Sequence, residues 1–188
     1  MSQQATIRAI IGLGNPGARF TFNRHNIGFR VVDHFAERFH GTWKESDTLA
    51  YAEIKLPAEL ADQGCQLSPA LLLIKPLTYM NTSGRVIPFL TKKGIQPQEI
   101  LVVHDELEKK FGYLGIRLGG SARGHNGLRS IIGLIGEQFW RLRFGIGRPE
   151  RKEEVADFVL SNFTKDEAAQ MDGLLDQAVD MLTRPFSP

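Results

Sequence analysis

The sequence predicts a single α/β domain in which a mixed, twisted β-sheet is flanked by helices on both faces. Apolar runs typical of buried strands alternate along the chain with segments of helical periodicity. The 188 residues, 42% of them hydrophobic, can bury one substantial core, whereas two domains would each be small. We therefore expect residues 1–188 to form one domain.

The first two elements are a strand and a helix joined by a loop. Residues 6–13 are an apolar run typical of a buried strand. In residues 27–39, Ile27, Val31 and Phe35 recur at helical spacing, which predicts an amphipathic helix. A strand followed by a helix is the repeating unit of a sheet that helices cover.

The next segments predict two strands and a second helix. Residues 51–56 and 70–76 have the composition of strands, and Pro76 ends the second because proline has no N–H for the ladder. Residues 82–94 predict a helix that contains a proline and stops at Gly94.

The alternation continues after residue 98. Residues 99–105 contain four consecutive apolar residues, which is typical of a central strand. Residues 113–118 and 141–147 predict two further strands, with a helix over residues 126–136 between them.

A capping box predicts the start of the last helix. Thr164 and Glu167 are three residues apart, so each side chain can bond the other residue's backbone amide. Leu175, Ala178 and Leu182 then follow at helical spacing, which predicts one continuous C-terminal helix.

Composition argues against export and against a membrane partner. Cys65 is the only cysteine, so no intramolecular disulfide can form, and the N-terminal residues lack the pattern of a signal peptide. No apolar run approaches the roughly 20 residues needed to cross a bilayer. We expect a cytoplasmic protein.

Positive charge is concentrated in one part of the chain. The net charge is only +2, but residues 107–152 hold ten Lys and Arg against three Asp and Glu. This asymmetry favours an anionic partner, with a solvated basic face as the alternative.

Residues 12–17, Gly-Leu-Gly-Asn-Pro-Gly, have the glycine spacing of a dinucleotide-binding loop. Such a site needs a helix that starts at once and an acidic residue at the end of the second strand. Here residues 18–26 lack a helical pattern, Asp33 falls inside the predicted helix, and Pro16 removes a backbone amide. A nucleotide-dependent oxidoreductase is therefore disfavoured, and we expect no cofactor.

Polar side chains follow several predicted strands, where open α/β sheets bind ligands. They are Asn15, His25, Asn81, Asp105, His125 and Asn126. Histidines near a strand-end carboxylate fit general-base hydrolysis by water, because no serine lies in a G-x-S-x-G turn and Cys65 is remote. A metal site is the alternative, although no H-E-x-x-H or paired C-x-x-C spacing supports it. Its candidate ligands are His25, His104, Asp105 and His125.

Six motifs occur in a family-like order and spacing. They are GLGNPG (12–17), RHNIG (24–28), KPLTYMNTSG (75–84), ILVVHDELE (100–108), GHNGLRSI (124–131) and RLRFGIGRP (141–149). Together they resemble the bacterial-type peptidyl-tRNA hydrolases over roughly residues 6–160. The resemblance implies hydrolysis of the ester between a peptide and the 3′ ribose of tRNA, by a monomer without cofactor or metal.

The resemblance also assigns roles to single residues. His25 would be the base that deprotonates water, and Asp105 would orient its ring. Met80 and His125 would line the cleft for the peptide and the tRNA 3′ end. Asn126 would contact the water or the oxyanion. The asparagines that would hold substrate and water are Asn15, Asn81 and Asn126.

The basic stretch supplies candidates for contacts to tRNA phosphates. Arg117 and Arg143 match positions that the family uses near the tRNA terminus. The full set is Lys109, Arg117, Arg123, Arg129, Arg141 and Arg143. Such contacts give affinity with little sequence information, which suits an enzyme that accepts many tRNAs.

The chain departs from the family pattern at two places. Arg123 stands where the family often has glycine, so a positive φ there would cost about 1 to 2 kcal/mol. The C-terminal segment is shorter than the tail usual in the family.

The alternative function is that of an inactive relative that binds RNA as a splicing or RNA-processing cofactor. The intact His25, Asp105 and three asparagines argue against it.

Overall fold

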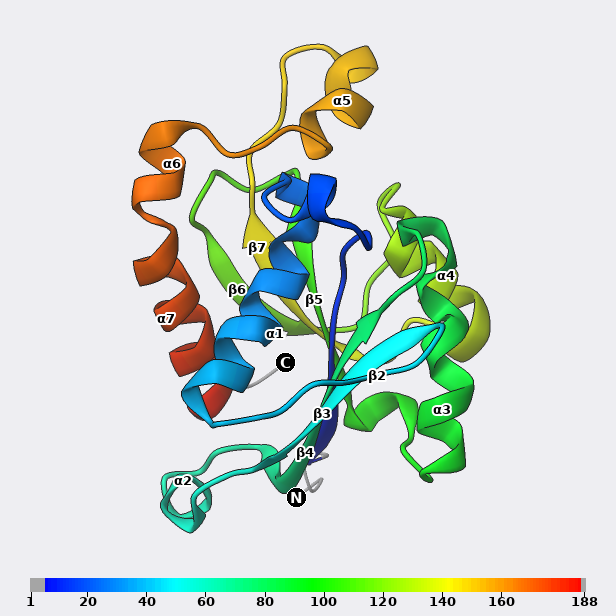
Figure 1. Ribbon diagram of the computed structural model, residues 1–188, viewed down its shortest axis with the longest axis vertical. Helices are drawn as coiled ribbons and strands as arrows, with labels where there is room; N and C mark the ends of the chain where they lie inside the picture. Colours follow the sequence, from blue (N-terminus) through cyan, green and yellow to red (C-terminus); the bar gives the residue numbers. More distant parts are fainter. Residues whose placement is uncertain (1–5, 187–188) are drawn as a thin grey trace.

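A seven-stranded mixed sheet forms the centre of the computed structural model, which describes residues 6–186 (Figure 1). The strand order is β2-β3-β4-β1-β5-β7-β6. The strands are β1 (Ile7–Gly12), β2 (Lys44–Glu45), β3 (Leu49–Lys55), β4 (Leu67–Pro76), β5 (Ile100–Glu106), β6 (Leu114–Leu118) and β7 (Trp140–Gly145). The central strands β4, β1, β5 and β7 run parallel, and antiparallel strands complete both edges.

Helices cover both faces of this sheet, which confirms the predicted fold class (Figure 1). They are α1 (Ile27–Arg38), α2 (Ala58–Asp62), α3 (Ile87–Lys92), α4 (Asn126–Ile135), α5 (Val155–Val159), α6 (Lys165–Ala169) and α7 (Met171–Thr183). Two 3-10 turns matter for the site, η2 (Arg24–Asn26) and η3 (Met80–Val86). In the part of the chain that the structure describes, no helix is long and apolar enough to span a bilayer.

Two predicted helices are each divided in the structure. Residues 82–94 begin as the 3-10 turn η3 and become α-helical at Ile87, so Pro88 lies in the first turn of α3, where its missing N–H breaks no bond. The C-terminal helix starts at the predicted capping box but is interrupted at Gln170, whose N–H donates to Glu167 O, three residues back. The prediction of one continuous helix was therefore wrong.

Alternate strand residues build a separate core on each face of the sheet. Ile10 and Val103 pack with α1 and α7 on one face. Ile11 and Val102 pack with η3, α3 and α4 on the other. Because both faces are buried, the central strands are continuous apolar runs without alternation.

The position of β1 creates a crevice at the carboxyl edge of the sheet. β1 pairs with β4 on one side and with β5 on the other, so strands that come later in the chain lie on both sides of it. α1 starts very close to this edge, because a Cβ on Gly28 would lie 2.4 Å from both Leu13 N and Val103 O. This close approach brings η2, which precedes α1, to the end of β5.

Candidate active site

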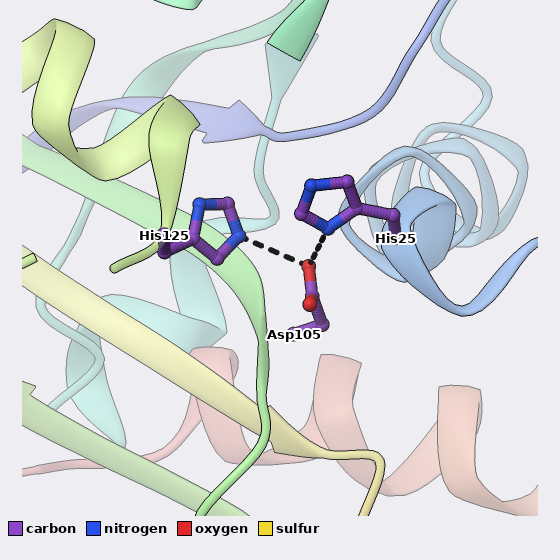
Figure 2. Close-up of side chains that lie close together, drawn as sticks. All are labelled: His25, Asp105 and His125. Atoms are coloured by element: carbon purple, nitrogen blue, oxygen red, sulfur yellow. Dashed lines mark hydrogen bonds and ion pairs between the residues drawn. The ribbon is translucent and has the colours of Figure 1, made fainter. Parts of the chain in front are cut away.

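Two histidines share one carboxylate oxygen at the carboxyl edge of the sheet (Figure 2). His25 Nδ1 lies 2.8 Å from Asp105 Oδ1, and His125 Nε2 lies 3.0 Å from the same oxygen. The two imidazole ring centroids are 4.9 Å apart. The residues come from η2, β5 and the start of α4, so segments far apart in the sequence form the cluster.

Backbone contacts determine which nitrogen of His125 carries its proton. His125 is the N-cap of α4, and its Nδ1 accepts from the amides of Gly127 and Leu128, at 3.2 and 3.4 Å. An accepting Nδ1 has a free lone pair, so the proton of the neutral ring lies on Nε2. His125 therefore donates to Asp105.

His25 also donates to Asp105, which leaves its Nε2 as the nitrogen that can accept a proton. Burial lowers the pKa of His25, but the charge of Asp105 and the hydrogen bond to it outweigh burial, so the pKa lies above its ordinary value. Burial raises the pKa of Asp105, yet the charges of both histidines and their hydrogen bonds hold it well below its usual range. Asp105 is therefore ionised in the folded protein at neutral pH.

The arrangement fits a hydrogen-bonded cluster better than a metal site. Ligand atoms of His25, Asp105 and His125 lie within 4.8 Å of one another. However, a metal would have to replace the proton on His125 Nε2, while the other nitrogen of that ring already accepts two amides. His104, the fourth candidate ligand, is not in this group.

His104 has a structural contact instead. Its Nδ1 donates to the backbone oxygen of Asp105 at 2.7 Å, and its ring meets the His125 ring edge-on. Burial and the neighbouring His125 lower the pKa of His104 to about 3, so the ring is neutral.

Asn15 is held in a reciprocal network with a residue that the sequence analysis did not assign. The Asn15 amide donates to Asn26 Oδ1, and Asn26 Nδ2 donates to the Asn15 oxygen, both at 2.9 Å. Asn15 Oδ1 accepts from the Met80 amide at 2.8 Å. The Asn15 side chain therefore has its Nδ2 left for other partners. The only sequence signal for Asn26 was its place beside His25 in the RHN motif.

The other predicted substrate residues divide into buried and exposed groups. Met80 is buried, and a Cβ on Gly127 would lie 2.5 Å from its Sδ and 3.2 Å from His125 Cε1, so Met80 and His125 lie close together. Asn126 is exposed and lines the cleft beside the cluster. Asn81 is exposed outside that lining, and among the described residues no hydrogen bond holds its side chain.

A cleft of about 480 Å³ opens beside the three clustered residues. One wall comes from α5 and the residues before it, and another from the loop between β6 and α4. Its basic lining residues are Arg117, Arg123, Arg141, Arg143, Arg148 and Lys152. Its carboxylates are those of Asp105, Glu106, Glu108 and Glu153, so the cations outnumber them by two and the cleft favours anionic groups.

The six basic candidates from the sequence occupy different environments. Arg117, Arg123 and Arg143 line the cleft, while Lys109 and Arg129 lie outside its lining. Lys109 lies over the Tyr113 ring, 4.9 Å from its centroid.

Arg141 is turned inward, although it also borders the cleft. It is 3% exposed and donates to the backbone oxygens of Ser121 and Gly120. Burial and the positive charge of Arg117 lower its pKa to about 10. Arg141 therefore holds the loop before α4 in place, and its prediction as a phosphate contact is not supported.

Arg123 has a left-handed backbone, so the conformation that favours glycine at this position is kept. Its φ is 44°, in a loop where Gly119, Gly120 and Gly124 also have positive φ. This backbone conformation costs about 1 to 2 kcal/mol, and it leaves the Arg123 side chain exposed at the cleft.

Comparison with known proteins identifies the family. The family model for peptidyl-tRNA hydrolase matches residues 9–187. The chain belongs to the peptidyl-tRNA hydrolase family. The match continues through α7, beyond the roughly residues 6–160 over which the motifs resemble the family.

Relatives match this chain over most of their length. It is 46% identical over 174 residues to a peptidyl-tRNA hydrolase from Sulfurihydrogenibium sp., which covers 92% of this chain and 87% of that protein. Identity to the Mycobacterium tuberculosis peptidyl-tRNA hydrolase is 42% over 173 residues, covering 91% and 86%. The crystal structure of peptidyl-tRNA hydrolase from Acinetobacter baumannii matches with a TM-score of 0.85 and 37% identity, over 97% of this chain and 89% of that one.

Proposed function

We propose that this protein hydrolyses the ester between a peptide and tRNA with water that His25 activates. Membership of the family supports the reaction. The choice of His25 as the base is supported by its free Nε2, because both ring nitrogens of His125 already have partners. His25 Nε2 takes a proton from water as the water oxygen attacks the ester carbonyl. The bond from the carbonyl carbon to the ribose 3′ oxygen then breaks, and the same proton passes to that oxygen.

Asp105 stabilises the imidazolium that forms when His25 accepts the proton. Its charge and its bond to Nδ1 favour the protonated ring, which is also why the pKa of His25 is raised. The hydrogen bond from His125 restricts the carboxylate from the other side. Burying a carboxylate has a desolvation cost, and a protein that only binds RNA does not need this carboxylate between two histidines. The cluster therefore argues against a relative that acts only as a splicing or RNA-processing cofactor.

Asparagine amides are proposed to hold the substrate and the oxyanion. Asn126 lines the cleft beside the cluster, and an amide nitrogen there can donate to the oxyanion. Asn15 has its Nδ2 left over after its oxygen accepts the Met80 amide. Asn81 is exposed in η3, next to Met80, where it can meet the bound peptide or the tRNA end.

Arg117, Arg123 and Arg143 are proposed to contact tRNA phosphates. All three line the cleft, and their contacts would be independent of tRNA sequence. Every residue named in this mechanism comes from one chain, so we propose that residues 1–188 act as a monomer. We place the activity in the cytoplasm, where translation supplies the substrate.

Release of peptide from an N-blocked aminoacyl-tRNA, without added metal or cofactor, tests this mechanism. Turnover should survive exhaustive chelation, because His25 needs no metal to accept a proton. If a chelator abolishes turnover and Zn²⁺ or Mg²⁺ restores it in His25→Ala, a metal activates the water and the roles of His25 and Asp105 are wrong.

A further inference from the structure

Arg24 is a buried cation directly before His25, and the mechanism above gives it no role. It is 4% exposed and begins the three-residue turn η2 that carries His25. A guanidinium is expensive to bury unless partners satisfy it, so its contacts indicate what it holds.

The guanidinium of Arg24 is surrounded by the segment that follows α5. Its Nη1 donates to Ser161 Oγ at 2.9 Å and to the Asn162 backbone oxygen, and its Nη2 pairs with Glu167 Oε2 at 2.5 Å. It also lies 4.5 Å from the centroid of the Phe158 ring. Both nitrogens of the guanidinium fork therefore reach the same segment, residues 158–167.

The backbone joins the same two segments. The Arg24 amide donates to the Ser161 oxygen at 3.0 Å, and Asn23 forms an isolated antiparallel bridge with Asn162. Asn23 Nδ2 also donates to the Leu160 oxygen. Residues 23 and 24 are thus attached to residues 160–162, immediately before His25 enters the site.

This segment continues directly from one wall of the cleft. Val155, Ala156 and Val159 of α5 line the cleft that contains the clustered residues. In Figure 1, α5 lies at the end of the molecule toward which β7 runs, beside the turn before α1. The placement of this wall is therefore linked through Arg24 to the base.

We infer that Arg24 is a positioning residue that holds His25 Nδ1 against Asp105 and ties this alignment to the α5 wall. The inference rests on the proposed role of His25 as the base. Because η2 has only three residues, a shift at Arg24 moves His25 with it. A misplacement of about 1 Å at a catalytic group can cost about 10²-fold in rate.

Arg24→Lys tests the inference, because it keeps the charge and loses the two-pronged contact. We expect kcat to fall about 10-fold or more and KM to change less than kcat, since no residue that lines the cleft is replaced. The pKa of His25, followed by NMR titration of the substrate-free protein, should fall toward its ordinary value as the contact with Asp105 weakens. Arg38→Lys is the matched control, because Arg38 pairs with Asp180 at the far end of α1.

Glu167→Gln provides a second test if Arg24→Lys does not fold. Glutamine at this position can still complete the capping box with Thr164, but it removes the charge that faces Arg24. We expect kcat and the pKa of His25 to fall in Glu167→Gln as well, each by less than in Arg24→Lys. A folded Arg24→Lys or Glu167→Gln with wild-type kcat and His25 titration, even with a lower Tm, would show a purely structural role. A shifted titration in a protein without hydrolase activity would instead contradict the proposed function alone.

Discussion

Asp105→Asn removes the charge of the cluster while keeping its shape. Asp105 Oδ1 accepts from His25 and His125, at 2.8 and 3.0 Å. The amide oxygen of asparagine can accept both bonds, because two donors facing one position exclude its NH₂ group from it. The change therefore isolates the carboxylate charge from the geometry.

The loss of rate follows from the bond between Asp105 and His25. A hydrogen bond to a charged group contributes about 1.5 to 3 kcal/mol, and 1.36 kcal/mol is a tenfold change in rate. Asparagine keeps a neutral hydrogen bond of about 0.5 to 1.5 kcal/mol, so the variant loses the difference of about 1 to 1.5 kcal/mol when His25 becomes protonated, and kcat/KM should fall about 5- to 13-fold. Any loss of tautomer control would increase the effect toward about 10⁴-fold.

The pH profile should change in the direction that the pKa shift dictates. His25 must be neutral to accept a proton, so kcat/KM rises with pH through the pKa of the free enzyme. The charge and hydrogen bond of Asp105 hold this pKa above its ordinary value of about 6.5, against the effect of burial. Asp105→Asn removes the charge and leaves only a neutral hydrogen bond against burial, so the rise should move to lower pH and reach a lower plateau.

Initial rates of peptide release across the pH range measure both effects. Asp33→Asn is the matched control, because Asp33 pairs with Lys75 at 2.6 Å outside the cluster. Its rate and profile should match the wild type. Wild-type turnover and an unshifted profile in Asp105→Asn would refute the pairing of Asp105 with His25 as the source of catalysis.

Three further predictions concern the base, the phosphate contacts and the loop before α4. His25→Ala should lower kcat by at least about 10²-fold while tRNA binding persists, and near-normal peptide release would exclude His25 as the base. Arg143→Gln should make the dependence of log KM on log salt shallower by roughly 0.7 to 0.9, and an unchanged slope would remove Arg143 from the phosphate contacts. Arg141→Gln should lower the free energy of unfolding in urea by about 1 to 3 kcal/mol, because the oxygens of Gly120 and Ser121 lose donors. Unchanged stability would mean that solvent satisfies both oxygens.

Local sequence patterns determined the sheet and its main helices. The apolar runs of β1 and β5 and residues 71–74 of β4 are buried on both faces, so their composition alone identifies them. The shorter elements β2 and α2 have two and five residues, too few for a period to emerge. The family and its reaction were also readable, because six ordered motifs span most of the chain.

The tertiary structure decided what each polar side chain contacts. The sequence placed Asn15 at a strand end but did not indicate its exchange of hydrogen bonds with Asn26. It assigned His125 to the cleft but did not predict that this ring caps α4 and donates to Asp105.

Two arginines show why the sequence did not predict these contacts. Arg141 and Arg143 are two residues apart on β7 and have the same local chemistry, yet Arg141 holds backbone oxygens of a loop while Arg143 lies 3.2 Å from Tyr113 Oη. The spacing of similar residues along the chain indicates only which face of a strand or helix they share. The partner of a buried donor depends on which distant backbone reaches it, and chain packing alone decides that.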